Sequence, residues 1–458
     1  MKLYVNQFIS NLQAYIHNKL FPSSEHGKLG ISFLIIGLCL GFAVRSGMLW
    51  FIDPNFDSGD AASYLVDAQK WIAYFSNFSD DNTINYPENY RPPLYALFLA
   101  VIISVFGKNV FALQLTQIVM SLVATLLITR VAANRAPNTA PWVFGAMLLS
   151  PFEAVFTTVA LSETLTMFLI TAAAFAIFTY DGMRRWIIGG ILFGLTALTR
   201  DIYLPLVLLV AISWIVLGKG SIRIRFFSAC ILIASTCLVV LPWTLRNYVV
   251  TDQFVPVSEG RLGFSIWMGS WAINGDFTRG DATGQRIYPT EAFRNQVEMD
   301  LMHEALSLFE QGKRREADRV FRSLAIQRIQ DEPFTVIGKY FMRAPRLWLG
   351  TRFDIFQLNQ KWFPRESRVW TMAKITLWGL NSVIILLGIV GIFLALRRRH
   401  PVSILIIPIL YTAIVYFPLN SFENRYSQPV YPFVIIFAVF TLISFTDKLR
   451  TTNYFIEK

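Results

Sequence analysis

The sequence predicts an all-α protein that crosses a membrane many times, and three observations support this fold class. Hydrophobic residues make up 54% of the 458 residues and charged residues only 16%, whereas soluble domains carry roughly 25% charged residues. Apolar stretches of about 20 residues, the length that crosses ~30 Å of hydrocarbon, recur along the chain. Lysine and arginine gather in the short segments between these stretches, as they do in loops at the cytoplasmic face of a membrane.

The first apolar stretch, residues 29–52, is expected to be an uncleaved membrane anchor, because no small-residue cleavage site follows it. Lys19 and Lys28 precede it, which predicts a cytoplasmic N-terminus. Pairs of apolar stretches separate the later basic clusters, and this spacing gives ten spans. The stretch 92–106 is short for a full crossing. We therefore expect a half-helix on the outer side there, with an eleventh span as the alternative.

This topology divides the chain into five regions. They are a cytoplasmic tail (1–28), a transmembrane module (29–246) whose first outer loop covers 53–91, a large outer-face loop (247–371), C-terminal transmembrane helices (372–447) and a second cytoplasmic tail (448–458). Within the large loop, apolar residues at helical spacing predict two helices between residues 291 and 329, separated at Gly312. A stretch rich in Trp and Phe, 341–362, is expected to lie along the membrane surface.

Composition and spacing argue against several classes of function. The net charge is +11, but no basic stripe interleaved with aromatic residues is present, so nucleic-acid binding is not expected. The three cysteines fall in apolar stretches and are expected to be small core residues rather than a disulfide framework. The four histidines are isolated. The residues therefore indicate no cofactor and no metal site, although a divalent metal stays possible. Phosphate-binding, dinucleotide and zinc-protease motifs are also absent.

Acidic residues at the outer ends of the apolar stretches are the first candidates for chemistry. Asp57 and Asp60 lie in the first outer loop, where a carboxylate can act as general base toward a hydroxyl group at the lipid surface. The alternative is a solvated loop carboxylate or the N-cap of a helix at 61–72. Glu153 and Glu163 lie near the ends of apolar stretches, where a carboxylate at bilayer depth is costly and marks a functional candidate. Glu163 has the alternative of simply beginning the next helix.

Several basic and aromatic residues fall on the same predicted face and are candidates for contacting an anionic headgroup. For each of them, a purely structural role is the alternative to binding a headgroup. Arg200 can pair with Asp201 at a hairpin corner, and Arg246 can anchor a span at the interface beside Trp243. The candidates of this kind are Arg91, Arg200, Arg246, Arg425 and Tyr426, and Tyr64 in the first outer loop is a further substrate-site candidate.

Six segments, taken in chain order, carry a family resemblance. They are GDAASYLVDA, RPPLYALFLAVIISVFG, SPFEAVFTTVALSETLTMFL, GILFGLTALTRDIYLPL, LPWTLRNYVVTDQFVPVSEGRLG and ENRYSQPVYP. Together they resemble the polyprenyl-phosphate-dependent glycosyltransferases of the GT-C class. The most similar branch, glycosyltransferase family 39-like, includes the protein O-mannosyltransferases and the lipid A aminoarabinose transferases. The resemblance covers most of the chain between about residues 30 and 440.

The resemblance implies a GT-C-like fold of about ten to eleven transmembrane helices with outer-face juxtamembrane helices. It also implies transfer of a sugar from a polyprenyl-phosphate donor to a lipid, glycan or protein acceptor. The transfer would take place at the outer face of a bacterial plasma membrane and invert the anomeric carbon. No nucleotide is needed, because the lipid carrier already holds the activated sugar.

The resemblance also assigns roles to residues. Asp60 matches the family's catalytic aspartate by its spacing to Tyr64 and Ala68, and Asp57 is the fallback. Positive partners for the leaving phosphate would be Arg91, Arg200 and Arg246. The sequence departs from the family pattern at three places. Ala61 follows Asp60 where the protein mannosyltransferases carry an acidic pair, and Asp201 follows Arg200 where relatives often carry proline or a neutral residue. The segment SEGRLGFSIWMGS lacks the usual glycine–asparagine pattern.

Two other functions remain open from the sequence. A glycolipid flippase or transporter would bind the same headgroup without chemistry. Transporters of this kind tend to show internal repeats and broken spans near the midplane, whereas the candidate residues here fall on one face. A non-catalytic membrane scaffold subunit would use the acidic loop only as surface.

Overall fold

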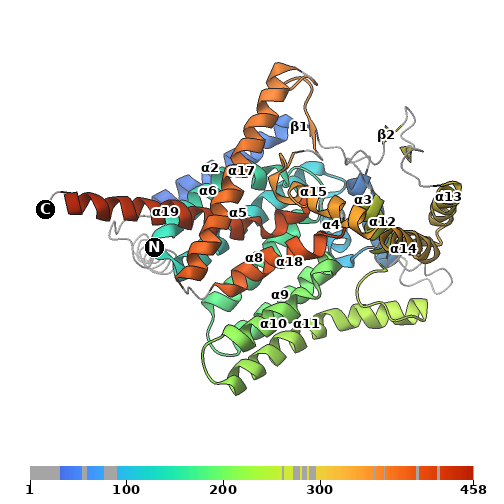
Figure 1. Cartoon of the computed structure of the whole chain (residues 1–458), viewed down its shortest axis with the longest axis horizontal. Coiled ribbons are helices and arrows are strands. Elements are labelled where there is room, and N and C mark those ends of the chain that lie inside the picture. The colour runs from blue at the N-terminus through green and yellow to red at the C-terminus, as the bar shows by residue number, and fades with distance from the viewer. Residues whose placement is uncertain are drawn as a thin grey trace. The chain divides into compact units, whose positions relative to one another are not determined.

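The computed structural model of the chain describes residues 31–53, 59–76, 90–259, 262–271, 279–280, 286–287, 295–353, 356–365, 367–398, 402–419 and 423–456. These residues form helices with a few two-residue strands, so the all-α prediction is confirmed (Figure 1). The chain divides into two compact units. Unit 1 contains Met1–Val257, Thr351–Ile409 and Gln428–Lys458, and unit 2 contains Ser258–Gly350 and Leu410–Ser427.

Unit 1 consists mainly of long apolar helices. Its helices are α2 (Ile31–Phe51), α3 (Gly59–Ser76), α4 (Pro93–Phe106), α5 (Val110–Arg135), η1 (Pro137–Thr139), α6 (Ala140–Leu149), α7 (Pro151–Val155), α8 (Glu163–Thr179), α9 (Arg184–Thr199), η2 (Asp201–Tyr203), α10 (Leu206–Leu217), α11 (Ile222–Thr251), α17 (Arg368–Arg397) and α19 (Tyr431–Ile456). Strands β1 (Ile52–Asp53) and β4 (Gln357–Leu358) pair antiparallel. Residues of both units contribute to α18 (Ser403–Tyr416) and η4 (Asn424–Val430).

Five helical segments among the described residues are long and apolar enough to cross a membrane. They are Ser32–Phe51, Val110–Arg135, Ile222–Thr251, Arg368–Arg397 and Asn424–Thr446. The prediction of a multi-pass membrane protein is therefore confirmed, while the count of ten or eleven spans stays a prediction. Helix α4 has 14 residues and is thus about 21 Å long, shorter than the hydrocarbon layer. Four shorter apolar helices accompany the long ones: Pro93–Phe106, Glu163–Thr179, Asp201–Leu217 and Ser403–Tyr416.

The expected core position of the cysteines is wrong. Cys39 lies exposed on α2, and Cys230 and Cys237 lie exposed on α11. Both helices are apolar enough to span a membrane, and lipid tails are as apolar as a protein core. A small apolar side chain is therefore stable on the outside of such a helix.

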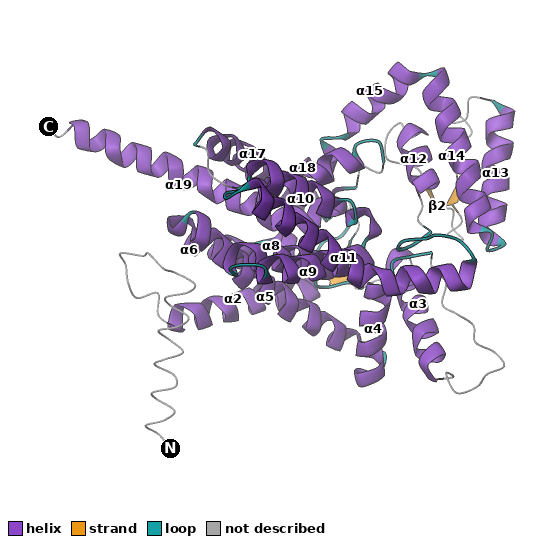
Figure 2. Ribbon diagram, turned by 90° about the horizontal axis from the view of Figure 1, so that it is seen from below, coloured by secondary structure: helices purple, strands orange, loops and turns teal. Residues whose placement is uncertain are grey.

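Helices α5, α8, α9 and α11 pack against one another in that order (Figure 2). Two glycines bring α9 and α11 close together. If Gly190 carried a Cβ atom, that atom would clash with the backbone oxygen of Leu232 and lie 2.7 Å from Cβ of Ser235. A Cβ atom on Gly194 would likewise lie 2.7 Å from Cβ of Val239. Small residues at four-residue spacing permit this approach between membrane helices. The Gly190–Gly194 step thus serves helix packing.

The α5, α8 and α9 helices have two distinct ends. Near the start of α5, Gln117 Nε2 donates to the carbonyl oxygen of Val159 (2.8 Å), just before α8 begins. Near the end of α5, Asn134 Nδ2 donates to the carbonyl oxygen of Phe178 (3.1 Å), where α8 ends. Helices α5 and α8 therefore run parallel, and α9 returns along them. We call the end with the start of α8 the Glu163 end, and the opposite end the Arg135 end.

Unit 2 is built around a small helical core of its own. Its elements are α12 (Leu262–Trp271), β2 (Arg279–Gly280), β3 (Arg286–Ile287), α13 (Gln296–Glu310), α14 (Arg314–Asp331), α15 (Pro333–Arg343) and α16 (Arg346–Leu349). Strands β2 and β3 pair antiparallel. Trp267 packs on Phe321 with ring centroids 5.0 Å apart. Gly312 has a φ of +79° and separates α13 from α14, as the sequence predicts.

The close α9–α11 contact predicts a large effect of one added methyl group. Gly190→Ala should lower the stability of the protein by about 1–3 kcal/mol, because the backbone of α11 has to move away. The measurement is thermal unfolding of the purified protein in detergent.

Gly145→Ala is the matched control for this substitution, since a Cβ on Gly145 in α6 meets nothing within 4 Å. The control should leave the unfolding temperature unchanged or raise it slightly. Equal unfolding temperatures for the two variants would contradict the packing role of Gly190.

Candidate functional site

The candidate base Asp60 lies in the first turn of α3. One Nη atom of Arg91 lies 2.8 Å from Oδ1 of Asp60, and the two form an ion pair. The Asp60 side chain is 28% exposed and that of Arg91 is 15% exposed, so a ligand can reach both. The fallback base, Asp57, lies outside the described residues.

Arg91 also contacts Tyr64, one turn further along α3. Its guanidinium carbon lies 4.6 Å from the centre of the Tyr64 ring, within the range of a cation–π interaction. Burial alone lowers the pKa of Arg91, but Tyr64 and Asp60 outweigh it and the net pKa is raised. Arg91 is therefore a fixed positive charge at this site.

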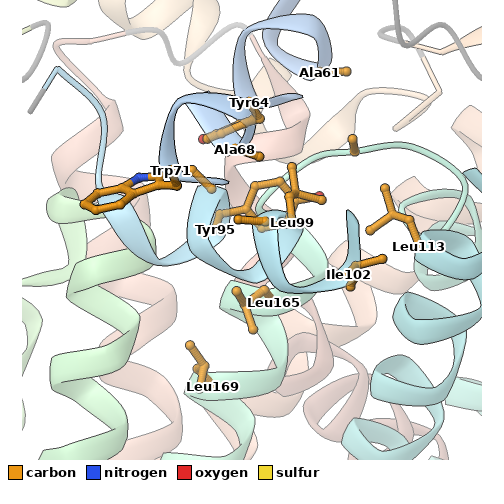
Figure 3. Close-up of a cluster of buried hydrophobic side chains, with 13 residues drawn as sticks. Ala61, Tyr64, Ala68, Trp71, Tyr95, Leu99, Ile102, Leu113, Leu165 and Leu169 are labelled. Atoms are coloured by element: carbon orange, nitrogen blue, oxygen red, sulfur yellow. The ribbon is translucent and has the colours of Figure 1, made fainter. Parts of the chain in front are cut away.

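The apolar side of α3 holds Asp60 and Tyr64 in place. Ala61, Tyr64, Ala68 and Trp71 recur at helical spacing and are buried. They belong to one hydrophobic cluster with residues of α4 and α8 such as Tyr95, Leu99 and Leu165 (Figure 3). The rings of Tyr64 and Tyr95 meet edge to face at 4.8 Å. Helix α3 is thus packed as a rigid element and positions its first turn beside Arg91.

Hydrogen bonds connect this cluster to the start of α8. The Tyr64 hydroxyl donates to Oγ of Ser162 (3.4 Å), and the Tyr95 hydroxyl donates to Oε1 of Gln117 (3.2 Å). Gln117 in turn donates to carbonyl oxygens of the segment before α8. Tyr64 is therefore linked both to Arg91 and to the residue preceding Glu163.

Glu163 and Arg200 form a second ion pair at the Glu163 end of the bundle. Oε1 of Glu163 and an Nη atom of Arg200 lie 3.4 Å apart, and their side chains are 2% and 14% exposed. Glu163 is the first residue of α8, where a negative charge is favoured by the helix dipole. Arg200 directly follows the last residue of α9. The two candidates are thus brought together although 37 positions separate them.

Arg246 lies on α11 near aromatic residues of α3. Its guanidinium carbon lies 4.7 Å from the ring of Trp243, and it donates a hydrogen bond to Oδ1 of Asn247 (3.1 Å). The Trp243 ring packs at 5.7 Å on Trp71 of α3. Arg246 therefore belongs to the surroundings of α3, as Asp60 and Arg91 do.

Glu153 belongs to a separate buried cluster of unit 1. It is 1% exposed, and the positive charges of Arg45 and Arg352 attract its carboxylate. Arg352, in turn, donates to Oδ1 of Asn381 (3.1 Å) and to Oε1 of Gln428 (2.7 Å). This cluster joins α2, α7, α17 and η4.

Arg425 and Tyr426 fall in unit 2, whereas the other described candidates fall in unit 1. Within unit 2, Arg425 pairs with Glu423 and donates to the hydroxyl of Tyr426 (3.2 Å). The Tyr426 ring stacks on Tyr416 with centroids 4.7 Å apart. No group of three or more His, Cys, Asp or Glu residues in the described part of the chain could hold a metal ion.

The family model of dolichyl-phosphate-mannose-protein mannosyltransferases matches residues 90–243. The expected resemblance is confirmed. The match covers about a third of the chain and contains Arg91, Glu153, Glu163 and Arg200. Asp60 and Arg246 lie outside it. No curated protein matches the chain.

Solved structures of GT-C membrane enzymes are also similar to the chain, at low identity. ArnT from Cupriavidus metallidurans in the apo state is 15% identical, with a TM-score of 0.42, covering 90% of this chain and 77% of that one. ArnT bound to undecaprenyl phosphate is 14% identical, with a TM-score of 0.39 and coverages of 92% and 78%. The Archaeoglobus fulgidus oligosaccharyltransferase tethered with an acceptor peptide is 13% identical, with a TM-score of 0.49 and coverages of 92% and 50%.

Sequence reasoning missed three polar residues that the structure ties to candidates. Ser162 accepts the Tyr64 hydrogen bond, and its position beside Glu163 was the available signal. Arg45 lies in the first apolar stretch and is completely buried. An arginine inside a span requires polar partners, so its presence was itself a signal. Arg352 has a φ of +61°, and nothing in its sequence neighbourhood marks it.

The Glu163–Arg200 pair can be tested by removing one charge and then both. Arg200→Met should destabilise the protein by about 3–5 kcal/mol, because it leaves a buried carboxylate without its positive partner. Arg200→Met combined with Glu163→Leu should recover most of that loss. Thermal unfolding in detergent measures both. A double variant as unstable as Arg200→Met would show that the two side chains do not act as a pair.

Proposed function

We propose that the protein is a glycosyltransferase that moves a sugar from a polyprenyl-phosphate carrier to a hydroxyl group of a lipid, glycan or protein acceptor. Its site lies at the Glu163 end of unit 1 and faces the periplasmic or extracellular side of a bacterial plasma membrane. The family match over residues 90–243 supports this class. The observation that carries the proposal is the ion pair between Asp60 and Arg91, because it sets a candidate base beside a candidate phosphate ligand.

Asp60 acts as the general base in this proposal. Its carboxylate takes the proton of the acceptor hydroxyl as that oxygen attacks the anomeric carbon. The bond between the anomeric carbon and the phosphate oxygen breaks, and polyprenyl phosphate leaves with the electron pair. Attack from the side opposite the leaving group inverts the anomeric carbon. Protonated Asp60 then returns its proton to water.

Arg91 has two alternative partners in this cycle. In the structure its guanidinium holds the Asp60 carboxylate at 2.8 Å. A phosphate group is an equally good partner for a guanidinium, so a bound donor draws Arg91 away from Asp60. A carboxylate released from an arginine is a better proton acceptor. Donor binding therefore prepares the base.

Arg200 and Arg246 supply further positive charge for the leaving phosphate. Fixed cations that face developing negative charge are among the largest contributions to catalysis. Arg200 is held by Glu163 and Arg246 by the Trp243 ring and Asn247, so neither has to be ordered during the reaction. The proposal assigns Glu163 to positioning Arg200 and Tyr64 to positioning Arg91.

The proposed role of Asp60 predicts a specific loss of activity. Asp60→Asn should lower the rate of sugar transfer by about 10²–10⁴-fold, the usual contribution of a general base. The assay incubates the purified protein with a labelled polyprenyl-phosphate sugar and acceptor lipids.

Asp67→Asn is the control, since it removes the same charge two turns further along α3 and should leave the rate within a few-fold of wild type. Full activity of Asp60→Asn would exclude its role as base, and loss of transfer only in Asp57→Asn would assign that role to Asp57. Lipid movement across the membrane without transfer would favour a flippase. A protein with neither activity would favour a scaffold subunit.

A further inference from the structure

The Arg135 end of unit 1 carries arginines that lie on aromatic rings. The guanidinium carbon of Arg135 lies 4.2 Å from the ring of Phe178. That of Arg185 lies 4.9 Å from the ring of Trp186 and 5.1 Å from the ring of Trp214. Helix α8, with 17 residues, separates this end from Glu163 by about 26 Å, close to the thickness of the hydrocarbon layer. The two ends therefore correspond to the two surfaces of a membrane.

Packing between helices fixes the aromatic rings at this end. Asn134, next to Arg135, donates hydrogen bonds to the carbonyl oxygen of Phe178 (3.1 Å) and to Oγ1 of Thr179 (3.3 Å). The Trp186 and Trp214 rings pack with centroids 4.7 Å apart and join α9 to α10. The arginines thus rest on a rigid support rather than on a loop.

Charge at this end is unbalanced. Arg135 ends α5 and Arg185 lies in the first turn of α9, and the positive charge of Arg185 opposes that of Arg135. Asp181 opposes the charge of Arg185, and the neighbouring Arg184 adds a further positive charge above the ring of Tyr180. An anion bound between like charges reduces their mutual repulsion.

Both arginines also have unused hydrogen-bonding capacity. The Nε atoms of Arg135 and Arg185 are buried and have no hydrogen-bond partner in the part of the chain that the structure describes. The two side chains are nevertheless half-buried rather than sealed in, so a ligand can approach from outside. A planar guanidinium matches the oxygen atoms of a phosphate group and binds them with two parallel hydrogen bonds.

Apolar surface lies next to these arginines and indicates what kind of phosphate compound fits. Ile187 on α9 is 43% exposed, and Val216 and Leu217 at the end of α10 are each 65% exposed. A free phosphate ion gains nothing from such a surface, whereas acyl chains lie along it. Basic sites between membrane helices are where anionic headgroups bind.

We propose that Arg135 and Arg185 together bind the phosphate headgroup of an anionic phospholipid at the end of the bundle opposite Asp60. The Phe178, Trp186 and Trp214 rings hold the two guanidinium groups, and the exposed residues of α9 and α10 accept the acyl chains. This site is independent of the proposed transfer reaction and involves none of its residues.

The test is a lipid titration of the purified full-length protein in detergent. Phosphatidylglycerol should raise the thermal unfolding temperature, and phosphatidylcholine with the same acyl chains should raise it much less. Arg135→Gln combined with Arg185→Gln should weaken phosphatidylglycerol binding by about tenfold or more, because it removes hydrogen bonds between charged partners. Native mass spectrometry counts the bound lipid molecules.

Two further variants keep the result interpretable. Arg223→Gln removes an equal charge from an exposed position at the start of α11 and should bind the lipid as wild type does. Arg135→Lys combined with Arg185→Lys retains the charge and should bind more weakly than wild type but more tightly than the glutamine variant. This pair also replaces the glutamine variant if that one fails to fold.

Three outcomes would overturn the proposal. They are equal stabilisation by phosphatidylglycerol and phosphatidylcholine, equal weakening by Arg223→Gln, and full stabilisation by inorganic phosphate alone. The last outcome would assign the site to a free anion instead of a lipid.

Discussion

The structure of unit 1 depends on the need to pair charges that lie inside or at the ends of an apolar bundle. An isolated charge in such surroundings is too costly to persist, but a pair or a hydrogen-bonded group is tolerated. Arg45 meets this requirement with Oγ of Ser121 and the carbonyl oxygens of Met147 and Leu148. Glu163 meets it with Arg200. Each of these contacts joins elements that are distant in sequence, so charge pairing also determines how the helices are arranged.

The same requirement explains why the Asp60–Arg91 pair, unlike the buried pairs, can exchange one partner for a ligand. Buried ion pairs add little stability compared with apolar side chains of the same size, so their value lies in positioning. Asp60 is more exposed than Glu163, and its partner Arg91 touches both Asp60 and Tyr64. A pair at the surface of the bundle can exchange partners with a ligand, whereas the Glu163–Arg200 pair is better suited to hold a cation in a constant place.

Local patterns in the sequence predict a large part of this structure. The apolar stretches identify the membrane helices, and Gly312 marks a helix boundary. The sequence also identifies both members of the Asp60–Arg91 and Glu163–Arg200 pairs, because charges near the ends of apolar stretches are few.

Pairing across long separations could not be predicted from the sequence. Nothing local indicates that Arg45 contacts Ser121, which lies 76 positions away, or that Arg352 contacts Gln428, also 76 positions away. The cysteines were misplaced for a related reason. Hydrophobic periodicity reports which side of a helix avoids water, and in a membrane both the core and the lipid satisfy that condition.

In the proposed cycle, Arg91 exchanges the Asp60 carboxylate for the donor phosphate. This exchange can be measured as the affinity of the purified protein for polyprenyl phosphate, without acceptor, for wild type, Asp60→Asn and Arg91→Gln. Because Asp60 competes with the phosphate for Arg91, Asp60→Asn should bind polyprenyl phosphate more tightly than wild type, and Arg91→Gln should bind it more weakly. Weaker binding by Asp60→Asn, or unchanged binding by Arg91→Gln, would contradict this exchange.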